Sequence, residues 1–354
     1  MGRRKFSALL WICTALCLGL LCVACADSAV PTTGPATQAT VPTEAAPPQT
    51  GFHVDGATLL DANGNPFMMR GVNHLHAWYP DQMEETAHAL AAAGCNCVRI
   101  VLSNGQQWER TEADSVASII QICKENNLIA ILEVHDTTGV PGKDALLAAA
   151  QYFVDIQDVL VGQEAYVILN IANEWPSLSN STTWKSAYLE AIPMLRQAGL
   201  RHTIMVDCAG GGQNGKCMEN AGQDLLECDP LENVMFSLHI YGTAGSNPAS
   251  ISENLQYAAK AGLCVCVGEF GHRHSDGDVN IAYLMQYCLD NSIGYLAWAW
   301  KGNAPQSAHL DLALAWDGSA LSPGWGQTVI HGPNGIHATA EICSIFFDKS
   351  TDNS

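Results

Sequence analysis

The sequence predicts an α/β fold, a (β/α)8 (TIM) barrel with a short N-terminal β-hairpin that closes the barrel bottom. Eight apolar runs of strand length alternate with segments that carry helical signals. The 354-residue chain is long enough for one such barrel, whose usual size is roughly 250 residues. The apolar runs also end in polar side chains, which a barrel explains and a doubly wound open sheet does not.

The expected strands are apolar runs typical of strands buried on both faces of a parallel sheet. They are Phe67–Asn73, Asn96–Leu102, Ile129–His135, Tyr166–Asn173, Thr203–Cys208, Val234–Ile240, Leu263–Glu269 and Gly294–Trp300. The expected helices are Asp81–Ala93, Ala113–Glu125, Leu146–Val161, Thr182–Gln197, a short stretch at Asp224, Ser250–Ala261, Val279–Asp290 and Thr339–Phe347. Before the first strand, Gly51–Phe67 contains an Asn-Gly pair, which indicates a hairpin, and we expect it to cover the barrel bottom.

The first 50 residues differ in composition from the expected barrel. Residues 1–25 read as a signal peptide, with a basic start followed by a short apolar stretch. Two processing sites remain open: cleavage after Ala26, or a bacterial lipobox that leaves Cys25 as a lipid-carrying N-terminus. Residues 26–50 are rich in Pro, Thr and Ala and predict a disordered linker. We therefore expect an exported bacterial protein, extracellular or lipid-anchored, with a folded domain over residues 51–349 and a tail over 350–354.

Charge and cysteine usage limit the partners. The formal net charge of -19 argues against nucleic acid or an anionic membrane as the main partner. Cysteines inside strand runs are expected to be small buried hydrophobes, whereas Cys208, Cys217 and Cys228 share a region where a bridge is possible. The His-rich segment 271–278 is more typical of a hydrogen-bonded loop than of a metal site. We predict no metal and no cofactor.

Polar or aromatic side chains lie at the C-terminal end of every expected strand. They are Arg70, Asn73, His74, Arg99, His135, Asp136, Asn173, Glu174, Asp207, His239, Tyr241, Glu269, Trp298 and Trp300. The C-terminal face of a barrel hosts the active site in essentially all characterised barrel enzymes. The sequence therefore predicts that these side chains converge on a site.

Two glutamates at strand ends predict the chemistry of that site. Glycoside hydrolysis needs one carboxylic acid to protonate the leaving oxygen and one carboxylate on the other side of the anomeric carbon. Glu174 and Glu269 follow the fourth and seventh strands and can form such a pair. Arg99 can lower the pKa of a nearby carboxylate and keep it ionised as a nucleophile. Tyr241 can donate a hydrogen bond to the same group.

Other strand-end residues are candidates for holding a sugar. His239 and Asn173 can orient the acid and bind a hydroxyl group. Trp298 and Trp300 are two residues apart, so on a strand they would face the same side and form a platform for a pyranose ring. The Gly210–Gly212 run follows a strand without a P-loop pattern and is interpreted as a flexible loop.

Six motifs together resemble glycoside hydrolase family 5 of clan A, and within it the bacterial β-mannanase branch, subfamily 8. They are N-I-A-N-E-W (Asn170–Trp175), V-G-E-F-G-H (Val267–His272), R-G-V-N-H (Arg70–His74), E-V-H-D (Glu133–Asp136), H-I-Y (His239–Tyr241) and L-A-W-A-W-K-G-N (Leu296–Asn303). The resemblance extends from Gly51 to about Phe347. One departure is the Gly210–Gly212 run, where related enzymes tend to carry a bulky aromatic residue at an outer subsite.

The resemblance implies a retaining endo-β-1,4-mannanase that cleaves mannan, glucomannan or galactomannan, with Glu174 as acid/base and Glu269 as nucleophile. Separately, we expect a monomer. The supporting active-site residues that it implies are Arg99, His135, Asn173, His239 and Tyr241. The substrate-binding residues that we expect are Trp300, Trp298, Trp175, His74 and Trp78, with Trp300 nearer the mouth than Trp298. Two alternatives stay open: a β-1,4-endoglucanase of the same family, and a non-catalytic glycan-binding lipoprotein. The intact glutamate pair argues against the second.

Overall fold

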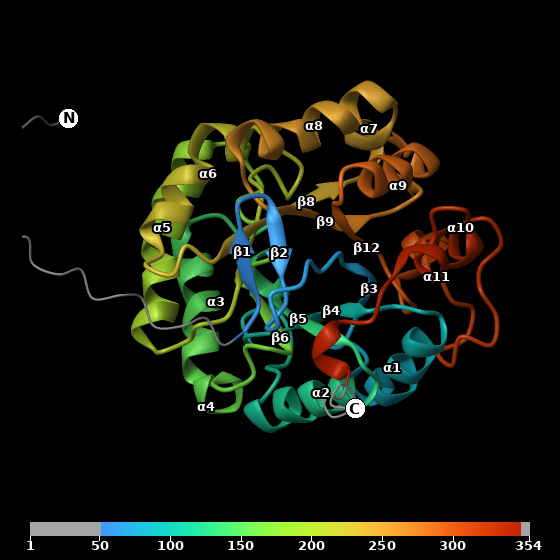
Figure 1. Cartoon of the computed structure of the whole chain (residues 1–354), viewed down its shortest axis with the longest axis horizontal. Helices are drawn as coiled ribbons and strands as arrows, with labels where there is room; N and C mark the ends of the chain where they lie inside the picture. The colour runs from blue at the N-terminus through green and yellow to red at the C-terminus, as the bar shows by residue number, and fades with distance from the viewer. Residues whose placement is uncertain (1–50, 348–354) are drawn as a thin grey trace, which may run out of the picture. The chain divides into compact units, whose positions relative to one another are not determined.

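The computed structural model describes residues 51–347, and within them eight parallel strands close into a barrel (Figure 1). Each strand pairs with its neighbours in the chain, and the last pairs with the first. The barrel strands are β3 (Arg70–His74), β4 (Cys97–Leu102), β5 (Ile129–Val134), β6 (Val167–Asn170), β7 (Ile204–Asp207), β8 (Val234–Ile240), β9 (Val265–Phe270) and β12 (Gly294–Ala297). The predicted (β/α)8 fold class is confirmed, and all eight expected strands are present.

A ring of helices surrounds the strands (Figure 1). The helices are α1 (Met83–Ala92), α2 (Ala113–Glu125), α3 (Lys143–Asp155), α4 (Gln157–Leu160), α5 (Ser181–Gln197), α6 (Lys216–Cys228), α7 (Gly242–Gly245), α8 (Pro248–Ala261), α9 (Ile281–Asp290), α10 (Trp325–His331) and α11 (Ile336–Thr339). Short 3-10 turns are η1 (Pro80–Gln82), η2 (His135–Thr137), η3 (Pro305–Leu310) and η4 (Ser344–Phe346).

The expected helix over Thr339–Phe347 is wrong. Helix α11 ends at Thr339, and the segment after it holds only the short turn η4. Cys343 is buried in the apolar cluster at the barrel bottom, and Ile345 and Phe346 pack against the same cluster. The apolar residues that suggested a helix therefore serve to cover the barrel bottom, while α10 occupies the helical position after β12.

Alternation along the strands separates the outer core from the barrel interior. In β4, Val98, Ile100 and Leu102 pack in the large cluster beneath the helices, whereas Cys97 belongs to the smaller interior cluster. Successive side chains of a strand point to opposite faces, so Arg99 shares the inward face of Cys97. The same pattern places Asp207 above Met205 on β7. The inward positions are thus apolar at the bottom and polar at the mouth.

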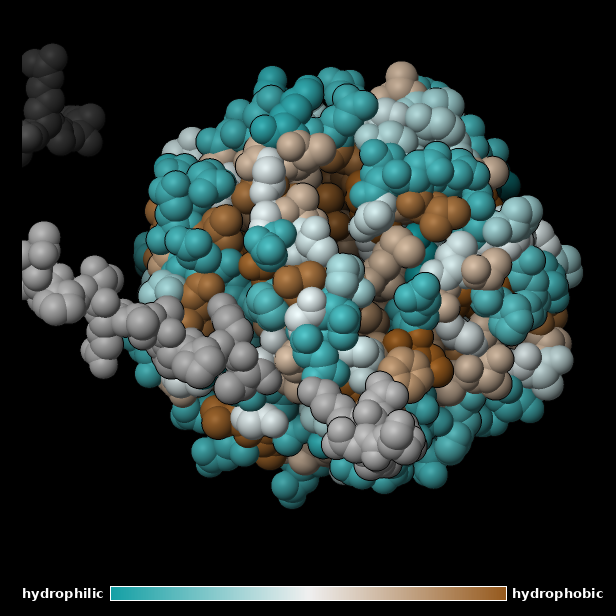
Figure 2. Space-filling view, viewed as in Figure 1, coloured by the Kyte–Doolittle hydropathy of each residue, from teal (hydrophilic) through white to brown (hydrophobic). Residues whose placement is uncertain are grey.

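The N-terminal hairpin plugs the barrel bottom, as predicted. Strands β1 (His53–Asp55) and β2 (Thr58–Leu60) pair antiparallel and lie in front of the barrel in Figure 1. Phe52, Leu59 and Phe67 are buried in one cluster with the lower interior side chains of the barrel. The Asn63-Gly64 turn lies after β2 and is closed by a bridge from Leu60 to Pro66. Hydrophobic residues on this face are interspersed with hydrophilic ones (Figure 2).

All ten cysteines between residues 51 and 347 are free thiols. Cys97, Cys264 and Cys266 are buried in the barrel interior, which confirms the prediction that they are small core residues. The bridge considered among Cys208, Cys217 and Cys228 does not form.

The predictions for residues 1–25, 26–50 and 350–354 fall outside the described residues, and so does the possible lipid anchor at Cys25. Between residues 51 and 347, no helix is both long enough and apolar enough to cross a membrane.

Candidate active site

Inward-facing polar side chains gather at the mouth of the barrel. Arg99, Glu133, Asp207, His239 and Glu269 are each at least 97% buried there. A register shift between Leu238 and His239 in β8 sets His239 opposite Glu269 on β9. Because a buried polar group without a partner costs several kcal/mol, such a cluster must be held together by its own hydrogen bonds and ion pairs.

The guanidinium of Arg99 is the centre of this network. Its Nε donates to Asn170 Oδ1 at 2.8 Å, and its Nη2 donates to Asn173 Oδ1 at 2.7 Å. Its Nη1 donates to both Asn73 Oδ1 at 2.9 Å and Glu269 Oε1 at 2.8 Å. Arg99 on β4 thus links β3, β9 and the C-terminal end of β6.

Two further carboxylates surround Arg99. Asp207 Oδ2 lies 3.5 Å from Nη2, and Glu133 Oε1 lies 3.8 Å from Nη1. Burial of Arg99 works against its charge, but the carboxylates of Glu133, Asp207 and Glu269 outweigh burial and raise its pKa. Arg99 is therefore a permanent cation inside a ring of acceptors.

Two donors fix the carboxylate of Glu269. Arg99 donates to Oε1, and the Tyr241 hydroxyl donates to Oε2 at 2.9 Å. Burial raises the pKa of Glu269 by more than His239 and Arg99 lower it, so the pKa lies above its ordinary value. The predicted effect of Arg99 has the right sign, but burial exceeds it.

Glu174 lies just beyond β6 in an uncommon backbone conformation. Its φ is 52°, a region that residues other than glycine seldom adopt. The backbone N–H of Glu174 donates to Asp207 Oδ2 at 2.9 Å, which holds this turn in place. Its side chain is 23% exposed, whereas that of Glu269 is only 4% exposed. Glu174 is therefore the glutamate with access to water.

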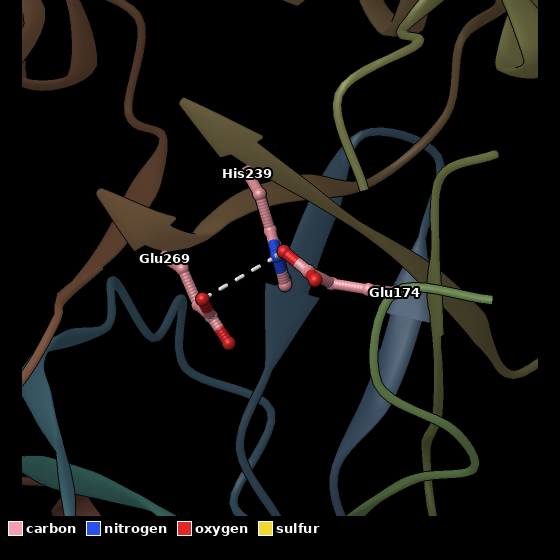
Figure 3. A group of neighbouring side chains, drawn as sticks. All are labelled: Glu174, His239 and Glu269. Carbon is pink, nitrogen blue, oxygen red and sulfur yellow. Dashed lines mark hydrogen bonds and ion pairs between the residues drawn. The ribbon is translucent and has the colours of Figure 1, made fainter. Parts of the chain in front are cut away.

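His239 lies between the two glutamates (Figure 3). Its Nδ1 is 3.2 Å from Glu174 Oε1 and 3.6 Å from Glu269 Oε2, and its Nε2 is 3.2 Å from Asp207 Oδ2. Burial favours the neutral ring, but the charges of Glu269 and Asp207 outweigh it and raise the pKa of His239 to about 10. The ring is therefore an imidazolium at neutral pH.

The Gly210–Gly212 segment packs closely against His239. The carbonyl of Gly212 accepts from the backbone N–H of His239 at 2.8 Å. A Cβ atom at Gly212 would lie 2.6 Å from a ring carbon of His239, and the φ of Gly212 is 76°. Only glycine meets both the close approach and the left-handed backbone at this position.

Glu174, His239 and Glu269 each offer one ligand atom, and these atoms lie within 4.8 Å of one another. Three such groups can in principle hold a metal ion. A metal-binding histidine must be neutral, whereas the charges of Glu269 and Asp207 raise the pKa of the metal-free His239. Both oxygens of Glu269 also already accept hydrogen bonds.

Glu174 and Glu269 line a cavity of about 710 Å³. The predicted site residues that line it are His135, Asn173, Glu174, Tyr241, Glu269, Trp78 and Trp298. Arg99 and His239 lie beneath them and act through the residues that they hold. This volume falls within the usual range for ligand pockets, roughly 300–1,000 Å³.

Aromatic rings form one part of the cavity wall. The Trp298 ring stacks on His135 with centroids 5.6 Å apart and an interplanar angle of 22°. Trp78 meets His135 edge-on at 5.3 Å, and Trp108 packs against Trp78 at 5.0 Å. His135 Nδ1 lies 2.8 Å from Glu133 Oε1. Burial favours the neutral His135 ring, but Glu133 outweighs burial and raises its pKa.

The structure corrects three of the expected substrate contacts. Trp175 and Trp300 are at most 1% exposed, and their indole N–H groups donate to the carbonyls of Gly142 and Trp316. His74 is fully buried without a hydrogen-bond partner for either ring nitrogen, and burial lowers its pKa to about 3. These three side chains belong to the packed interior and not to the cavity wall.

The error about Trp300 has a simple cause. We expected the eighth strand to reach Trp300, so that Trp298 and Trp300 would face the same side. Strand β12 ends at Ala297, and strand alternation therefore does not apply to either tryptophan. Trp298 lines the cavity, and Trp300 points into the core.

Several cavity-lining residues are absent from the sequence-based site. They are Leu75, Tyr79, Gly211, Gln213, His274, Gly302, Asn303, Ala304, Ser307 and Leu310. They lie beyond the strand ends, mostly on loops, where no periodic pattern marks them. Only adjacency offered a signal: Tyr79 follows Trp78, and Asn303 ends the L-A-W-A-W-K-G-N motif. Asp207 was recognised as a strand-end residue, but its contacts with Glu174 and His239 were not foreseen.

Solved structures of known proteins share this fold. A β-mannanase from Streptomyces thermolilacinus, solved with mannohexaose, is 42% identical with a TM-score of 0.80; the match covers 84% of this chain and 99% of that chain. A β-mannanase from Thermomonospora fusca is 40% identical with a TM-score of 0.78, over 84% of this chain and 100% of that chain.

Sequence comparison gives the same relationship. A mannan endo-1,4-β-mannosidase from Salipaludibacillus agaradhaerens is 43% identical over 85% of this chain and 97% of its own length. The family model described as Cellulase (glycosyl hydrolase family 5) matches residues 60–304. The chain belongs to glycosyl hydrolase family 5 and is a glycoside hydrolase.

Proposed function

We propose that this chain is a retaining endo-β-1,4-mannanase in which Glu174 is the acid/base and Glu269 the nucleophile. The observation that carries the proposal is the closeness of the pair: an oxygen of Glu174 and an oxygen of Glu269 lie within 4.8 Å of each other. Retaining glycosidases hold their carboxyl groups ~5–5.5 Å apart, whereas inverting ones need roughly 6.5–9.5 Å to admit a water molecule. The short separation favours double displacement.

The two environments support different roles. Glu269 is buried, and its two carboxylate oxygens accept hydrogen bonds from Arg99 and Tyr241. These bonds fix the orientation of the carboxylate. Glu174 is partly exposed and faces the cavity, where it can exchange a proton with a leaving group or with water. A nucleophile benefits from fixed orientation, and an acid/base needs access to the solvent.

The reaction then proceeds in two steps. A Glu269 oxygen attacks the anomeric carbon, while Glu174 gives its proton to the glycosidic oxygen and the bond to the leaving sugar breaks. A glycosyl ester on Glu269 results. In the second step Glu174 takes a proton from water, the water oxygen attacks the same carbon, and Glu269 leaves as a carboxylate. Two inversions at one carbon retain the configuration.

The relatives favour mannan as the substrate. The similar structures named β-mannanase or mannanase have identities of 38–42% and TM-scores of 0.77–0.80. A structure named endoglucanase is 23% identical with a TM-score of 0.63. A second candidate, β-1,4-glucan hydrolysis, remains because a Caldicellulosiruptor saccharolyticus protein that is 38% identical over 77% of this chain is named β-mannanase/endoglucanase A.

Reducing-sugar release by the full chain tests the activity and the substrate. We expect high rates on glucomannan and galactomannan and little release from carboxymethylcellulose. Glu174→Gln and Glu269→Gln should each nearly abolish turnover and leave mannan binding largely intact. Glu164→Gln is a matched control, because Glu164 is also buried but does not line the cavity. Substantial activity in either active-site variant would remove that carboxylate from its role.

Two further measurements test the mechanism and the binding alternative. Proton NMR of the first products should show the β-anomer, whereas an initial α-anomer would indicate inversion. In affinity gels, wild-type protein should shorten the mannan that it binds. Retention without shortening would favour a non-catalytic glycan-binding protein.

We also propose export, with either free secretion or a lipid anchor at Cys25, and a monomeric state. The basic and apolar composition of residues 1–25 supports export. Mass spectrometry of the mature N-terminus separates the two forms: an unmodified start at Asp27 would eliminate the lipid anchor. Light scattering should give the mass of one chain, and a mass twice that size would contradict the monomer.

A further inference from the structure

A small hairpin after the Glu269 strand forms part of the cavity wall. Strands β10 (Arg273–His274) and β11 (Gly277–Asp278) pair antiparallel a few residues beyond β9. His274 at the end of β10 lines the cavity, and its ring packs against the Tyr241 ring with centroids 5.5 Å apart. The hydroxyl of the same Tyr241 donates a hydrogen bond to Glu269. Only the Tyr241 side chain therefore separates His274 from the Glu269 carboxylate.

The base of the hairpin is fixed by two reciprocal hydrogen bonds. His272 Nε2 donates to the carbonyl of His309 at 2.9 Å, and His309 Nε2 donates to the carbonyl of Arg273 at 3.3 Å. His309 lies in η3, which also contributes Ser307 and Leu310 to the cavity wall. The hairpin and η3 thus form one continuous surface.

The tip of the hairpin is fixed by Asp276. Its Oδ2 accepts from the backbone N–H of Thr243 at 3.0 Å, two residues after Tyr241. Gly242 leaves the room for this contact, because a Cβ atom there would collide with the Asp276 carboxylate. The hydrogen bond from Thr243, followed by that from His274, lowers the pKa of Asp276. Asp276 is therefore an anion tied to the backbone that carries Tyr241.

Asp276 also orients the ring of His274. Asp276 Oδ1 lies 2.6 Å from His274 Nδ1. A carboxylate only accepts, so the proton of this hydrogen bond resides on Nδ1. Within residues 51–347, Nε2 of His274 has no hydrogen-bond partner. The cavity-lining His274 ring therefore has one polar atom, Nε2, without a partner among the described residues. Asp276 and the Tyr241 ring hold the position of the His274 ring.

We propose that His274 contacts the bound glycan by hydrogen-bonding a sugar hydroxyl through Nε2, with Asp276 as the positioning residue that fixes the ring. A hydroxyl group suits this atom because it both donates and accepts hydrogen bonds. The proposal rests on the proposed function, since it names a contact with the same substrate. The ring is ordered before substrate arrives, so binding does not have to order it.

Kinetics on mannohexaose test the proposal. The contact lies outside the two carboxylates that form and break bonds, so its loss should raise KM and leave kcat near the wild-type value. We expect His274→Ala to raise KM by about threefold to tenfold, the size of one hydrogen bond. His274→Gln should recover part of the loss, because the glutamine amide can both donate and accept. Arg273→Ala is the matched control: Arg273 is 69% exposed on the same hairpin and does not line the cavity.

The positioning role has its own readout. Asp276→Ala should raise KM at least as much as His274→Ala does, because Asp276 also holds the backbone at Thr243. The double variant should be no worse than Asp276→Ala alone, because the contact of His274 with the glycan depends on Asp276. Additive effects would overturn the positioning role of Asp276. An unchanged KM in His274→Ala, or a loss confined to kcat, would overturn the contact.

The outcomes also separate this proposal from the proposed function. If the wild-type chain cleaves mannohexaose and His274→Ala has the same KM, the proposed His274 contact is wrong and the proposed function stands. A wild-type chain that neither cleaves nor binds mannohexaose contradicts both. Thermal unfolding of each variant shows whether a change in KM or kcat comes from misfolding. The Arg273→Ala variant is the reference for this measurement.

Discussion

Arg99 Nη1 lies 2.8 Å from Glu269 Oε1, although the two residues are 170 positions apart in the chain. The pair is buried, and the remaining guanidinium donors reach Asn170 and Asn173. A charged hydrogen bond of this kind sets the orientation of the carboxylate as well as its charge.

Arg99→Lys should damage catalysis more than the retained charge suggests. An ammonium is a compact point charge and cannot reproduce the planar fork that bonds Asn73, Asn173 and Glu269 together. Because small misplacements of reacting groups can cost 10²-fold, we expect kcat/KM to fall by about 10²-fold. The free energy of unfolding should fall by ~2 kcal/mol, the range for hydrogen bonds to charged groups. Steady-state kinetics and urea unfolding measure the two effects.

Arg196→Lys provides the comparison. Arg196 is also largely buried and pairs with Asp229 at 2.7 Å, but neither residue lines the cavity. Its substitution should lower the free energy of unfolding without changing kcat/KM. If the two variants had equal kcat/KM, Arg99 would be a structural residue only.

Tyr241→Phe should lower kcat with little change in stability. The substitution keeps the ring and removes the hydroxyl that donates to Glu269 Oε2. Removing one donor that stabilises a reacting group typically costs about 10²–10³-fold in kcat, and we expect a loss towards the lower end of that range. Tyr188→Phe is the matched control, because the buried Tyr188 hydroxyl has no hydrogen-bond partner. Equal kcat in both variants would show that the Tyr241 hydroxyl is dispensable.

Activity should depend on pH through Glu269, and stability should depend on pH through His239. Glu269 attacks as a carboxylate, and burial raises its pKa, so activity should rise with pH only above the ordinary carboxyl range. The pKa of His239 is raised from 6.5 to about 10, because Glu269 and Asp207 outweigh burial. Its stabilising contribution is complete below 6.5 and is lost as pH rises through about 10. The unfolding temperature should therefore decline towards pH 10.

Asp207→Asn tests the alkaline decline of the unfolding temperature. The amide removes one of the two charges that raise the pKa of His239, so the alkaline decline should move to lower pH by about one unit. Asp229→Asn changes another fully buried aspartate, one that pairs with Arg196 away from the cavity. That variant should lose stability and keep the wild-type pH profile. An unshifted alkaline decline in Asp207→Asn would contradict the assignment to His239.

Trp298→Ala and Trp300→Ala should separate binding from packing. Trp298 lines the cavity, so its loss should raise KM on mannohexaose by about tenfold, as expected when an aromatic sugar platform is removed. Trp300 is 1% exposed, and its loss should cost ~3–5 kcal/mol of unfolding free energy. Any folded Trp300→Ala protein should keep the wild-type KM. A raised KM in Trp300→Ala together with lost stability in Trp298→Ala would instead show that Trp300 is the substrate platform.

The sequence by itself determined the barrel and its two glutamates. Buried parallel strands have to be continuous apolar runs, so eight such runs are visible without a structure. A polar group at the end of a buried strand has few alternatives to a functional site, and Glu174 and Glu269 stand out for that reason. Tyr241 and His239, which contact the glutamates, were recognised because they lie at a strand end, and Arg99 because a charged residue inside an apolar strand is unusual.

Only the tertiary structure decided how each group behaves. Where the eighth strand ends determines that Trp298 faces the cavity and Trp300 does not. The depth of Glu269 makes burial outweigh the effect of Arg99 on its pKa. The link from His274 through Asp276 to Thr243 joins loops that follow different strands. Such contacts lie between residues far apart in the chain, and hydrophobic periodicity carries no information about which loops meet.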